Sequence, residues 1–215
     1  MSKIIGLIGV PGSGKTKLAN AIKRAFPENN FVIIDKYVEK LSDQFKMGIG
    51  VNATYVSNLH IAVSREQETR KNYLAEKNII VCGTIFDTLC YTGFYAETVA
   101  QSPIEDEVKS FSIQREVSAA QVFAYFCIDT LSVANNLFYL PTTDPESFAA
   151  ISVQNPKADT GENEVLDKAM QEALRRYGNP ATVLSPVHSK RMPLVLETLN
   201  KNADGNGIKT DSSGK

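Results

Sequence analysis

The stretch that decides the fold is GVPGSGKT, residues 9–16, which follows the apolar run IIGLI at residues 4–8. It matches the pattern G-x-x-x-x-G-K-[ST] in full, and it stands between a predicted strand and a predicted helix, the context in which this pattern binds phosphate. Glycines let the backbone turn its N–H groups toward phosphate oxygens, and the following helix adds the positive end of its dipole. A glycine-rich turn that merely connects strand to helix would not need all of these features together.

The residue types within this loop indicate which ligand it takes. Lys15 supplies a cation to the β- and γ-phosphates of a nucleoside triphosphate, and the Thr16 hydroxyl is expected to coordinate Mg²⁺. We therefore predict that ATP and Mg²⁺ bind here. The predicted phosphate-binding residues are Gly9, Pro11, Gly12, Ser13, Gly14, Lys15 and Thr16.

Short apolar runs alternate with longer amphipathic stretches along the chain, which is typical of βα units and a mainly parallel sheet. We expect a three-layer α/β/α fold with the ligand at the carboxyl ends of the strands. The predicted strands are residues 4–8, 31–34, 78–82, 136–140 and 181–184, and the predicted helices are residues 15–25, 37–45, 55–76, 87–99, 104–131, 162–176 and 189–201.

One domain over residues 1–201 accounts for these elements. Residues 142–161 contain prolines and show little periodicity, so they are predicted to form a long loop of the kind used as a lid. The tail, residues 202–215, is rich in Gly, Ser, Asp and Lys and is predicted to be disordered.

Charge and cysteine content restrict the partners and the compartment. The 23 Lys and Arg nearly balance the 24 Asp and Glu, so no strong field draws the chain to nucleic acid or an anionic membrane. Cys82, Cys90 and Cys127 lie in apolar surroundings without a paired ligand pattern, which favours reduced thiols and a cytoplasmic location, the host cytoplasm for a phage protein. His60 and His188 have no partner in sequence, so no histidine metal site is expected.

The glycine-rich segment at residues 9–16, called the P-loop below, stands between a predicted strand and a predicted helix. On this basis the chain resembles the small P-loop kinases, which include nucleoside monophosphate kinases, deoxynucleoside kinases, shikimate kinase and phage-type nucleotide kinases. The resemblance runs from residue 4 to about residue 201, and residues 9–16 are its specific part. It implies the P-loop NTPase fold, with a five-stranded, mainly parallel sheet in the order 2-3-1-4-5. It also implies a helical region for the phosphoryl acceptor and a mobile lid.

Asp35 ends the second apolar run, where several of these kinases place an acid that faces the acceptor hydroxyl. A carboxylate there is suited to orient the hydroxyl and accept its proton as the phosphoryl group moves. The alternative is that Asp35 caps the helix predicted from Tyr37, and the two roles can coexist.

The third predicted strand departs from the pattern of the resembling kinases. These often carry Asp-Arg directly after the strand, followed by a second Asp and a Tyr. Cys82 and Gly83 occupy the Asp-Arg positions here, whereas Asp87 and Tyr91 fit the later pair. Asp87 is expected to act through metal-bound water, to contact the acceptor, or to cap its helix, and the sequence leaves these alternatives open.

Several basic residues are candidates for holding anionic groups. Arg65 and Arg70 lie where the resembling kinases bind the acceptor's anionic group, although their charged neighbours favour a solvated face for either arginine alone. Arg191 follows the last strand, where it either stacks on the adenine base or forms an exposed basic helix start. The candidates for a cation over the transferring phosphate are Lys157, Arg175, Arg176 and Arg115.

These features predict an ATP-dependent phosphotransferase whose acceptor is a nucleotide or a nucleoside-like hydroxyl, with a deoxynucleoside monophosphate as the leading acceptor. A kinase of 5-hydroxymethyl-pyrimidine in DNA is the alternative, and the balanced net charge counts against that DNA partner. A nucleotide-binding ATPase or switch is the alternative of another class, but the Asp-x-x-Gly and Asn-Lys-x-Asp motifs of GTPases are not suitably placed. We expect no membrane association. Part of residues 104–131 either packs in the core or forms the face of a homodimer, and the sequence leaves these alternatives open.

Overall fold

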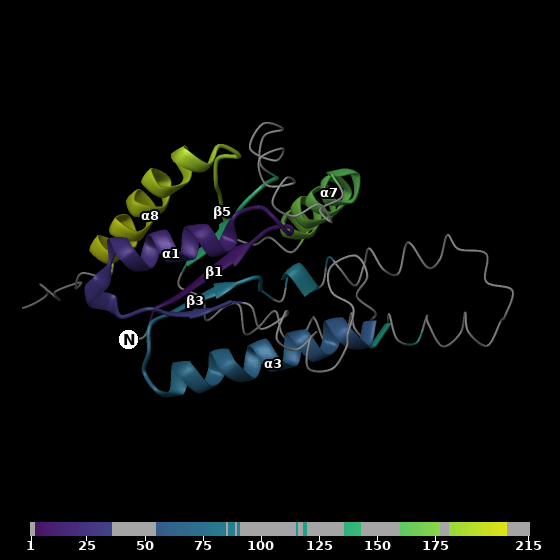
Figure 1. The fold of residues 1–215 in the computed structure, drawn as a ribbon, viewed down its shortest axis with the longest axis horizontal. Coiled ribbons are helices and arrows are strands. Elements are labelled where there is room, and N and C mark those ends of the chain that lie inside the picture. The colour runs from purple at the N-terminus through teal and green to yellow at the C-terminus, as the bar shows by residue number, and fades with distance from the viewer. Residues whose placement is uncertain are drawn as a thin grey trace, which may run out of the picture.

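Five parallel strands form the central sheet of the protein (Figure 1). The computed structural model describes residues 3–35, 55–84, 86–88, 90, 115, 118–119, 136–142, 160–176 and 181–205. The spatial order β2-β3-β1-β4-β5 and the parallel pairing of all neighbours confirm the predicted fold class and strand order. The strands are β1 (Ile4–Ile8), β2 (Val32–Ile34), β3 (Ile79–Cys82), β4 (Asn136–Tyr139) and β5 (Thr182–Val183).

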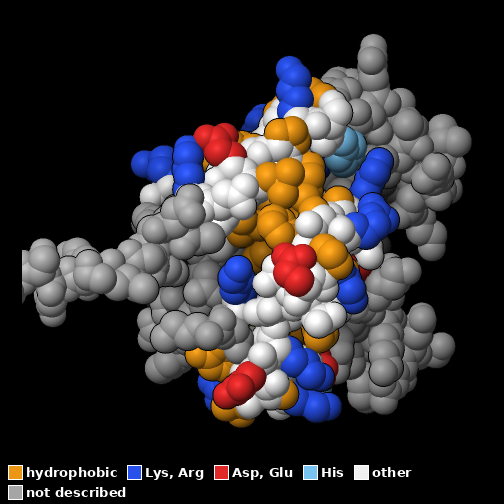
Figure 2. All heavy atoms as spheres, turned by 90° about the vertical axis from the view of Figure 1, so that its left-hand side faces the viewer, with side chains coloured by type: hydrophobic (Ala, Val, Ile, Leu, Met, Phe, Trp, Pro, Cys, Tyr) orange, Lys and Arg blue, Asp and Glu red, His pale blue; other side chains and the backbone are white. Residues whose placement is uncertain are grey.

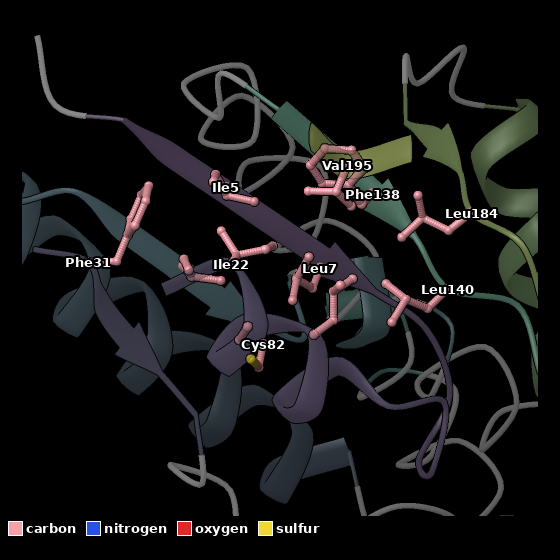
Figure 3. Packing of buried hydrophobic residues seen from close by; sticks show 12 residues of the cluster. Ile5, Leu7, Ile22, Phe31, Cys82, Phe138, Leu140, Leu184 and Val195 are labelled. Carbon is pink, nitrogen blue, oxygen red and sulfur yellow. The ribbon is translucent and has the colours of Figure 1, made fainter. Parts of the chain in front are cut away.

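The central strands are apolar on both faces, which is why they form a buried parallel sheet. Every residue of β1 is buried, with Ile5 and Leu7 on one face and Ile4 and Ile8 on the other. The face that carries Leu7 packs in one continuous cluster with neighbours from the other strands and from two helices (Figure 3). Its labelled members are Ile5, Leu7, Ile22, Phe31, Cys82, Phe138, Leu140, Leu184 and Val195.

Helices cover both faces of the sheet and complete the three layers. α1 (Lys15–Ala25) and α8 (Arg191–Gly205) pack on the Leu7 face, since Ile22 and Val195 belong to its cluster. α3 (Tyr55–Leu74) runs along the opposite side of the sheet from α1 (Figure 1). α7 (Thr160–Arg176) places its apolar stripe on the Ile8 face through Leu166, Met170 and Leu174.

The end of α3 differs slightly from the prediction, because a turn stops the helix before residue 76. Glu76 adopts a left-handed conformation with φ 54°. The N–H of Glu76 donates to the Tyr73 carbonyl at 2.9 Å, and the N–H of Lys77 donates to the Asn72 carbonyl at 3.1 Å. This pair of bonds is the Schellman arrangement, here with a glutamate at the position that usually holds glycine.

Other predicted boundaries shift at the C-terminus. A short 3-10 helix, η3 (His188–Lys190), precedes α8, so the last α-helix begins after the predicted residue 189. α8 (Arg191–Gly205) extends into residues 202–215, the predicted tail, and residues 206–215 lie outside the described residues. Several predicted segments lie outside the described residues, namely the helix 37–45, most of residues 91–131 and most of the loop 142–161. Of the predicted helix 104–131, the structure describes only Arg115, Ser118 and Ala119, and all three are helical.

The amino ends of the strands face the viewer in Figure 2, opposite the edge at which the P-loop lies. Apolar side chains gather near the centre of the described surface there, with Lys and Arg side chains around them and Asp and Glu interspersed. Among the described helices we find no segment with the length and hydropathy of a membrane span.

Candidate active site

Three neighbouring strands deliver the predicted site residues to one edge of the sheet. The P-loop follows β1, Asp35 follows β2, and Gly83 and Thr84 follow β3. Because β3 lies between β1 and β2 and all three are parallel, these carboxyl ends are adjacent. The sequence prediction that the motifs converge at one edge is therefore confirmed for the P-loop, Asp35 and Asp87.

The P-loop backbone has the conformation that its glycines were expected to allow. Gly12 and Gly14 have φ of 77° and 91°, in the left-handed region where a side chain is strained. A Cβ at Gly14 would also lie 2.4 Å from Cε1 of His188, so no larger residue fits. Within the described part of the chain, the N–H groups of Gly14, Lys15 and Thr16 donate to no other residue. These amides are thus available to an anion at the start of α1.

Lys15 is partly buried at this edge, with a side chain that is 17% exposed, and is held by the loop itself. Its Nζ donates to the Gly9 carbonyl and, at 2.9 Å, to the Val10 carbonyl, and lies 3.8 Å from Oδ1 of Asp87. Burial lowers the pKa of Lys15, and the Asp87 carboxylate opposes that shift. The ammonium is consequently poorly solvated, which strengthens its attraction to an anionic ligand.

Asp87 joins the P-loop to the segment after β3. Its Oδ2 accepts the Thr84 N–H at 2.6 Å, and the Thr84 hydroxyl accepts the Phe86 N–H at 3.2 Å. This reciprocal pair is a capping box, so Asp87 does cap the start of its helix. The other oxygen, Oδ1, accepts the Gly9 N–H at 3.3 Å and faces Lys15. One buried carboxylate therefore serves the helix start and the phosphate cradle together.

Arg65 and Arg70, which the sequence could not distinguish, have different environments. Arg65 is 9% exposed; its Nη1 donates to the Thr84 carbonyl at 3.3 Å, and a Cβ at Gly83 would lie 3.2 Å from its Nη2. Its charge is close enough to lower the pKa of Lys15, although burial is the larger cause. Arg70 has a side chain that is 70% exposed and lies 3.9 Å from Glu66. The solvated-face alternative is wrong for Arg65 and correct for Arg70.

Asp35 and Cys82 line the same edge beside Lys15. The charge of Asp35 affects both neighbours. For Lys15, burial is the larger effect and lowers the pKa, whereas Asp35 opposes that shift. Burial first, and then the Asp35 charge, raise the pKa of Cys82 to about 12, so the thiol is neutral at pH 7. The helix that Asp35 was predicted to cap lies outside the described residues, as does Tyr91.

Arg191 requires a correction, because it is not an exposed basic helix start. Its side chain is 1% exposed, and its guanidinium faces backbone carbonyls from three loops. The carbonyl acceptors are those of Ser13, Pro141 (3.1 Å), Ser185 (2.7 Å) and Pro186 (3.2 Å). His188, which the sequence gave no role, lies against Gly14 with its Nδ1 3.2 Å from Nη1 of Arg191.

The predicted cations over the transferring phosphate are only partly described. Arg175 is exposed on α7 and makes a two-pronged contact with Glu172, at 2.9 Å and 2.7 Å. Arg115 is exposed, whereas Lys157 and the side chain of Arg176 lie outside the described residues. Arg175 thus has a carboxylate partner on its own helix.

A buried carboxylate that the sequence analysis missed, Asp167, ties α7 to the end of β4. It accepts the hydroxyl of Tyr139, the Thr142 hydroxyl at 3.1 Å and the Gln171 amide at 3.1 Å. Burial and the bond to Asp167 raise the pKa of Tyr139. The start of the loop predicted from Thr142 is therefore fixed to α7. No group of three or more His, Cys, Asp or Glu in the described ranges is arranged to hold a metal ion unaided.

Comparison with known proteins gives structural likenesses alone. No family model and no curated protein sequence matches the chain. The crystal structure of NadR protein in complex with NR is similar with a TM-score of 0.66 and 10% identity, over 100% of this chain and 54% of that one. Deoxyadenosine kinase from M. mycoides with bound dATP is similar with a TM-score of 0.62 and 12% identity, over 91% of this chain and 98% of that one.

These likenesses show that the chain shares the fold of these structures, which agrees with the predicted α/β fold class. The chain spans about half the length of NadR and nearly all of the length of deoxyadenosine kinase. A second NadR structure, in complex with NAD and AMP-PNP, is also similar with a TM-score of 0.65 and 11% identity, over 100% of this chain and 52% of that one.

The opposing effects on Lys15 predict a pH dependence. Replacing Asp87 with Asn removes an influence that raises the pKa of Lys15, so the pKa falls further and the ammonium loses its proton at a lower pH. We expect the affinity for AMP-PNP to fall earlier in Asp87→Asn than in the wild type as the pH is raised, measured by calorimetry. Glu172→Gln, which removes an exposed carboxylate, should keep the wild-type profile, and an identical profile for Asp87→Asn would contradict the assigned ion pair.

Proposed function

We propose that this chain is an ATP-dependent phosphotransferase that moves the γ-phosphoryl group to a nucleotide or nucleoside acceptor, with a deoxynucleoside monophosphate as the leading acceptor. The observation that carries the proposal is a group of P-loop amides that have no partner in the described chain. They lie beside the partly buried ammonium of Lys15, at the edge of the sheet that also holds Asp35 and Arg65. The P-loop kinase fold supports this assignment.

The cradle fits a triphosphate with its metal. Gly14, Lys15 and Thr16 offer amides at the positive end of α1, and the Lys15 ammonium can exchange its two carbonyl partners for phosphate oxygens. The exposed Thr16 hydroxyl would hold Mg²⁺, with Asp87 acting through water. Mg²⁺, when bound, would offset negative charge on the β- and γ-phosphates.

Asp35 supplies the chemistry on the acceptor side. A carboxylate at the end of β2 is suited to hold the acceptor hydroxyl and to take its proton as the new O–P bond forms and the bond to the β-phosphate oxygen breaks. Asp35 is close enough to Lys15 for their charges to interact, which supports a role beside the phosphates that Lys15 would hold. ADP leaves with the electron pair of the broken bond.

Arg65 favours an acceptor that carries negative charge. Its guanidinium is buried beside Gly83, and a Cβ at that glycine would lie 3.2 Å from Nη2, so glycine leaves room for the guanidinium at the turn after β3. A guanidinium fork binds phosphate with two parallel bonds, which suits a nucleoside monophosphate. A deoxynucleoside is the second candidate, because a carboxylate such as Asp35 suits a hydroxyl acceptor, and a structural neighbour is deoxyadenosine kinase.

A panel assay tests the function. Radiolabelled ATP with Mg²⁺ is offered with deoxynucleoside monophosphates, deoxynucleosides, hydroxymethyl-containing DNA or no acceptor. We expect label in a deoxynucleotide product, and we expect Lys15→Ala to lower kcat/KM by about 100-fold or more, since one lost cation costs that much in comparable sites.

Lys17→Ala, an exposed lysine one turn into α1, is the matched control and should retain the wild-type rate. Label released as phosphate without any acceptor would favour the ATPase alternative. Label in the DNA alone would favour the base-modifying kinase. Near-normal transfer by Lys15→Ala would show that the cradle is wrongly assigned.

Asp35→Asn is expected to slow the transfer step and to spare ATP binding. The amide keeps the size and one acceptor oxygen but cannot take a proton, and a general base contributes about 100-fold or more. Single-turnover quench-flow gives the rate of transfer, and calorimetry gives the ATP dissociation constant. An unchanged single-turnover rate would remove Asp35 from the reaction.

Arg65→Gln and Arg70→Gln form a matched pair on α3. Losing the buried guanidinium should raise the KM for a monophosphate acceptor by about 10- to 100-fold, the range for a hydrogen bond to a charged group. Losing the exposed Arg70 should change KM little. If Arg65→Gln and Arg65→Lys both keep the wild-type KM, Arg65 does not bind the acceptor.

A further inference from the structure

Arg191 joins the P-loop to two other loops through a complete set of hydrogen bonds. A guanidinium has five N–H donors. Its five partners are the carbonyls of Ser13, Pro141, Ser185 and Pro186 and the Nδ1 atom of His188. The acceptors follow β1, β4 and β5, so one side chain ties together three strand ends. For Nδ1 to accept, the His188 ring must carry its proton on Nε2.

The bond to Ser13 determines how the next peptide group is turned. The peptide between Ser13 and Gly14 is trans, as are all those described, so its C=O and N–H point in opposite directions. With the carbonyl held by Arg191, the Gly14 N–H points away from Arg191. That N–H donates to no other described residue.

Little else in the described chain fixes this peptide. The Ser13 N–H donates to the Val10 carbonyl at 3.2 Å, but the buried Ser13 hydroxyl has no partner among the described residues. Glycine on one side, with φ of 91°, makes a flip of the peptide sterically cheap. A flipped peptide would present its carbonyl oxygen, rather than its N–H, to a phosphate.

We propose that Arg191 is a positioning residue that fixes the Ser13–Gly14 peptide with its N–H directed at the β-phosphate of the bound nucleotide. This rests on the proposed function only for the identity of the ligand. Arg191 itself is fixed because it begins α8, whose Val195 is fully buried in the core. His188 covers Gly14 from the same side and accepts the remaining Nη1 hydrogen of Arg191. The phosphate cradle thus depends on a residue 178 positions away in sequence.

The experiment measures the binding of ADP and of inorganic pyrophosphate, each with Mg²⁺, to the full chain by calorimetry. Arg191→Lys keeps the positive charge but cannot bond five acceptors, so both ligands should bind about 10- to 100-fold more weakly. Lys190→Gln, at the exposed neighbouring residue, should bind both ligands as the wild type does. A loss for ADP with no loss for pyrophosphate would overturn the proposal in favour of a contact with the base.

Glycine-selective ¹⁵N labelling measures the Gly14 amide directly. The shift of its signal on ADP binding would stay unchanged if Arg191 only stabilised the fold. The chain has 13 glycines, and the Gly14 signal is assigned by sequential triple-resonance spectroscopy of the uniformly labelled chain. In the wild type, saturating ADP should shift the Gly14 amide signal strongly, and in Arg191→Lys that shift should be largely lost at saturation. An unchanged shift, or ADP affinity within about twofold of the wild type in a folded variant, would overturn the proposal.

His188→Ala is a second variant that tests the same proposal if Arg191→Lys does not fold. It removes one of the five acceptors and the cover over Gly14 while retaining Arg191, so ADP and pyrophosphate should bind about three- to tenfold more weakly, by the typical net value of one hydrogen bond. Wild-type binding of both ligands by His188→Ala would count against the proposal. Failure of the wild type to bind ADP would instead overturn the proposed function, and absence of transfer with normal ADP binding would overturn the kinase assignment alone.

Discussion

The burial of Lys15 is the constraint on which the rest of the site depends. A desolvated ammonium is costly unless it has close partners, and the chain supplies two neutral carbonyls and the Asp87 carboxylate. Its lowered pKa shows that burial outweighs these partners. An anionic ligand that replaces the carbonyls therefore gains more than it would from a solvated lysine, and Arg65 adds further positive charge nearby.

The strand order places the P-loop on one side of the site and Asp35 on the other. With β3 between β1 and β2, the P-loop and Asp35 flank the turn at Gly83. The resembling kinases often carry an arginine at the position of Gly83, and here the guanidinium of Arg65 lies against that glycine from α3. A guanidinium is therefore present beside this strand end, although it comes from a helix. Cys82, which occupies the position of an acid, is a neutral thiol and leaves the negative charge to Asp35 and Asp87.

Local patterns in the sequence predicted the sheet and the P-loop, because both follow from periodicity and from the conformational needs of neighbouring residues. The burial of Arg65 was mispredicted because the charges around it suggested a solvated helix face. A spacing of three and four residues through Asn58, Ile61, Ala62 and Arg65 marks the buried stripe of α3 and was the available signal. Arg191 and Asp167 could not be placed, because Ser13 lies 178 residues from Arg191 and Tyr139 lies 28 residues from Asp167. Most of their partners are backbone atoms and hydroxyls, which form no sequence motif.

Such distant bonds imply that the phosphate cradle is completed only when the last helix is packed. α1 and α8 share one apolar cluster, so the packing that buries Val195 also holds Arg191 beside Ser13. A ligand that binds the ordered cradle then favours the docked state of α8, since anything that binds only the folded arrangement stabilises it. This coupling needs no contact between the ligand and α8, because the Ser13–Gly14 peptide group links the two. Its carbonyl accepts from Arg191, and its N–H, which donates to no other described residue, points to the opposite side.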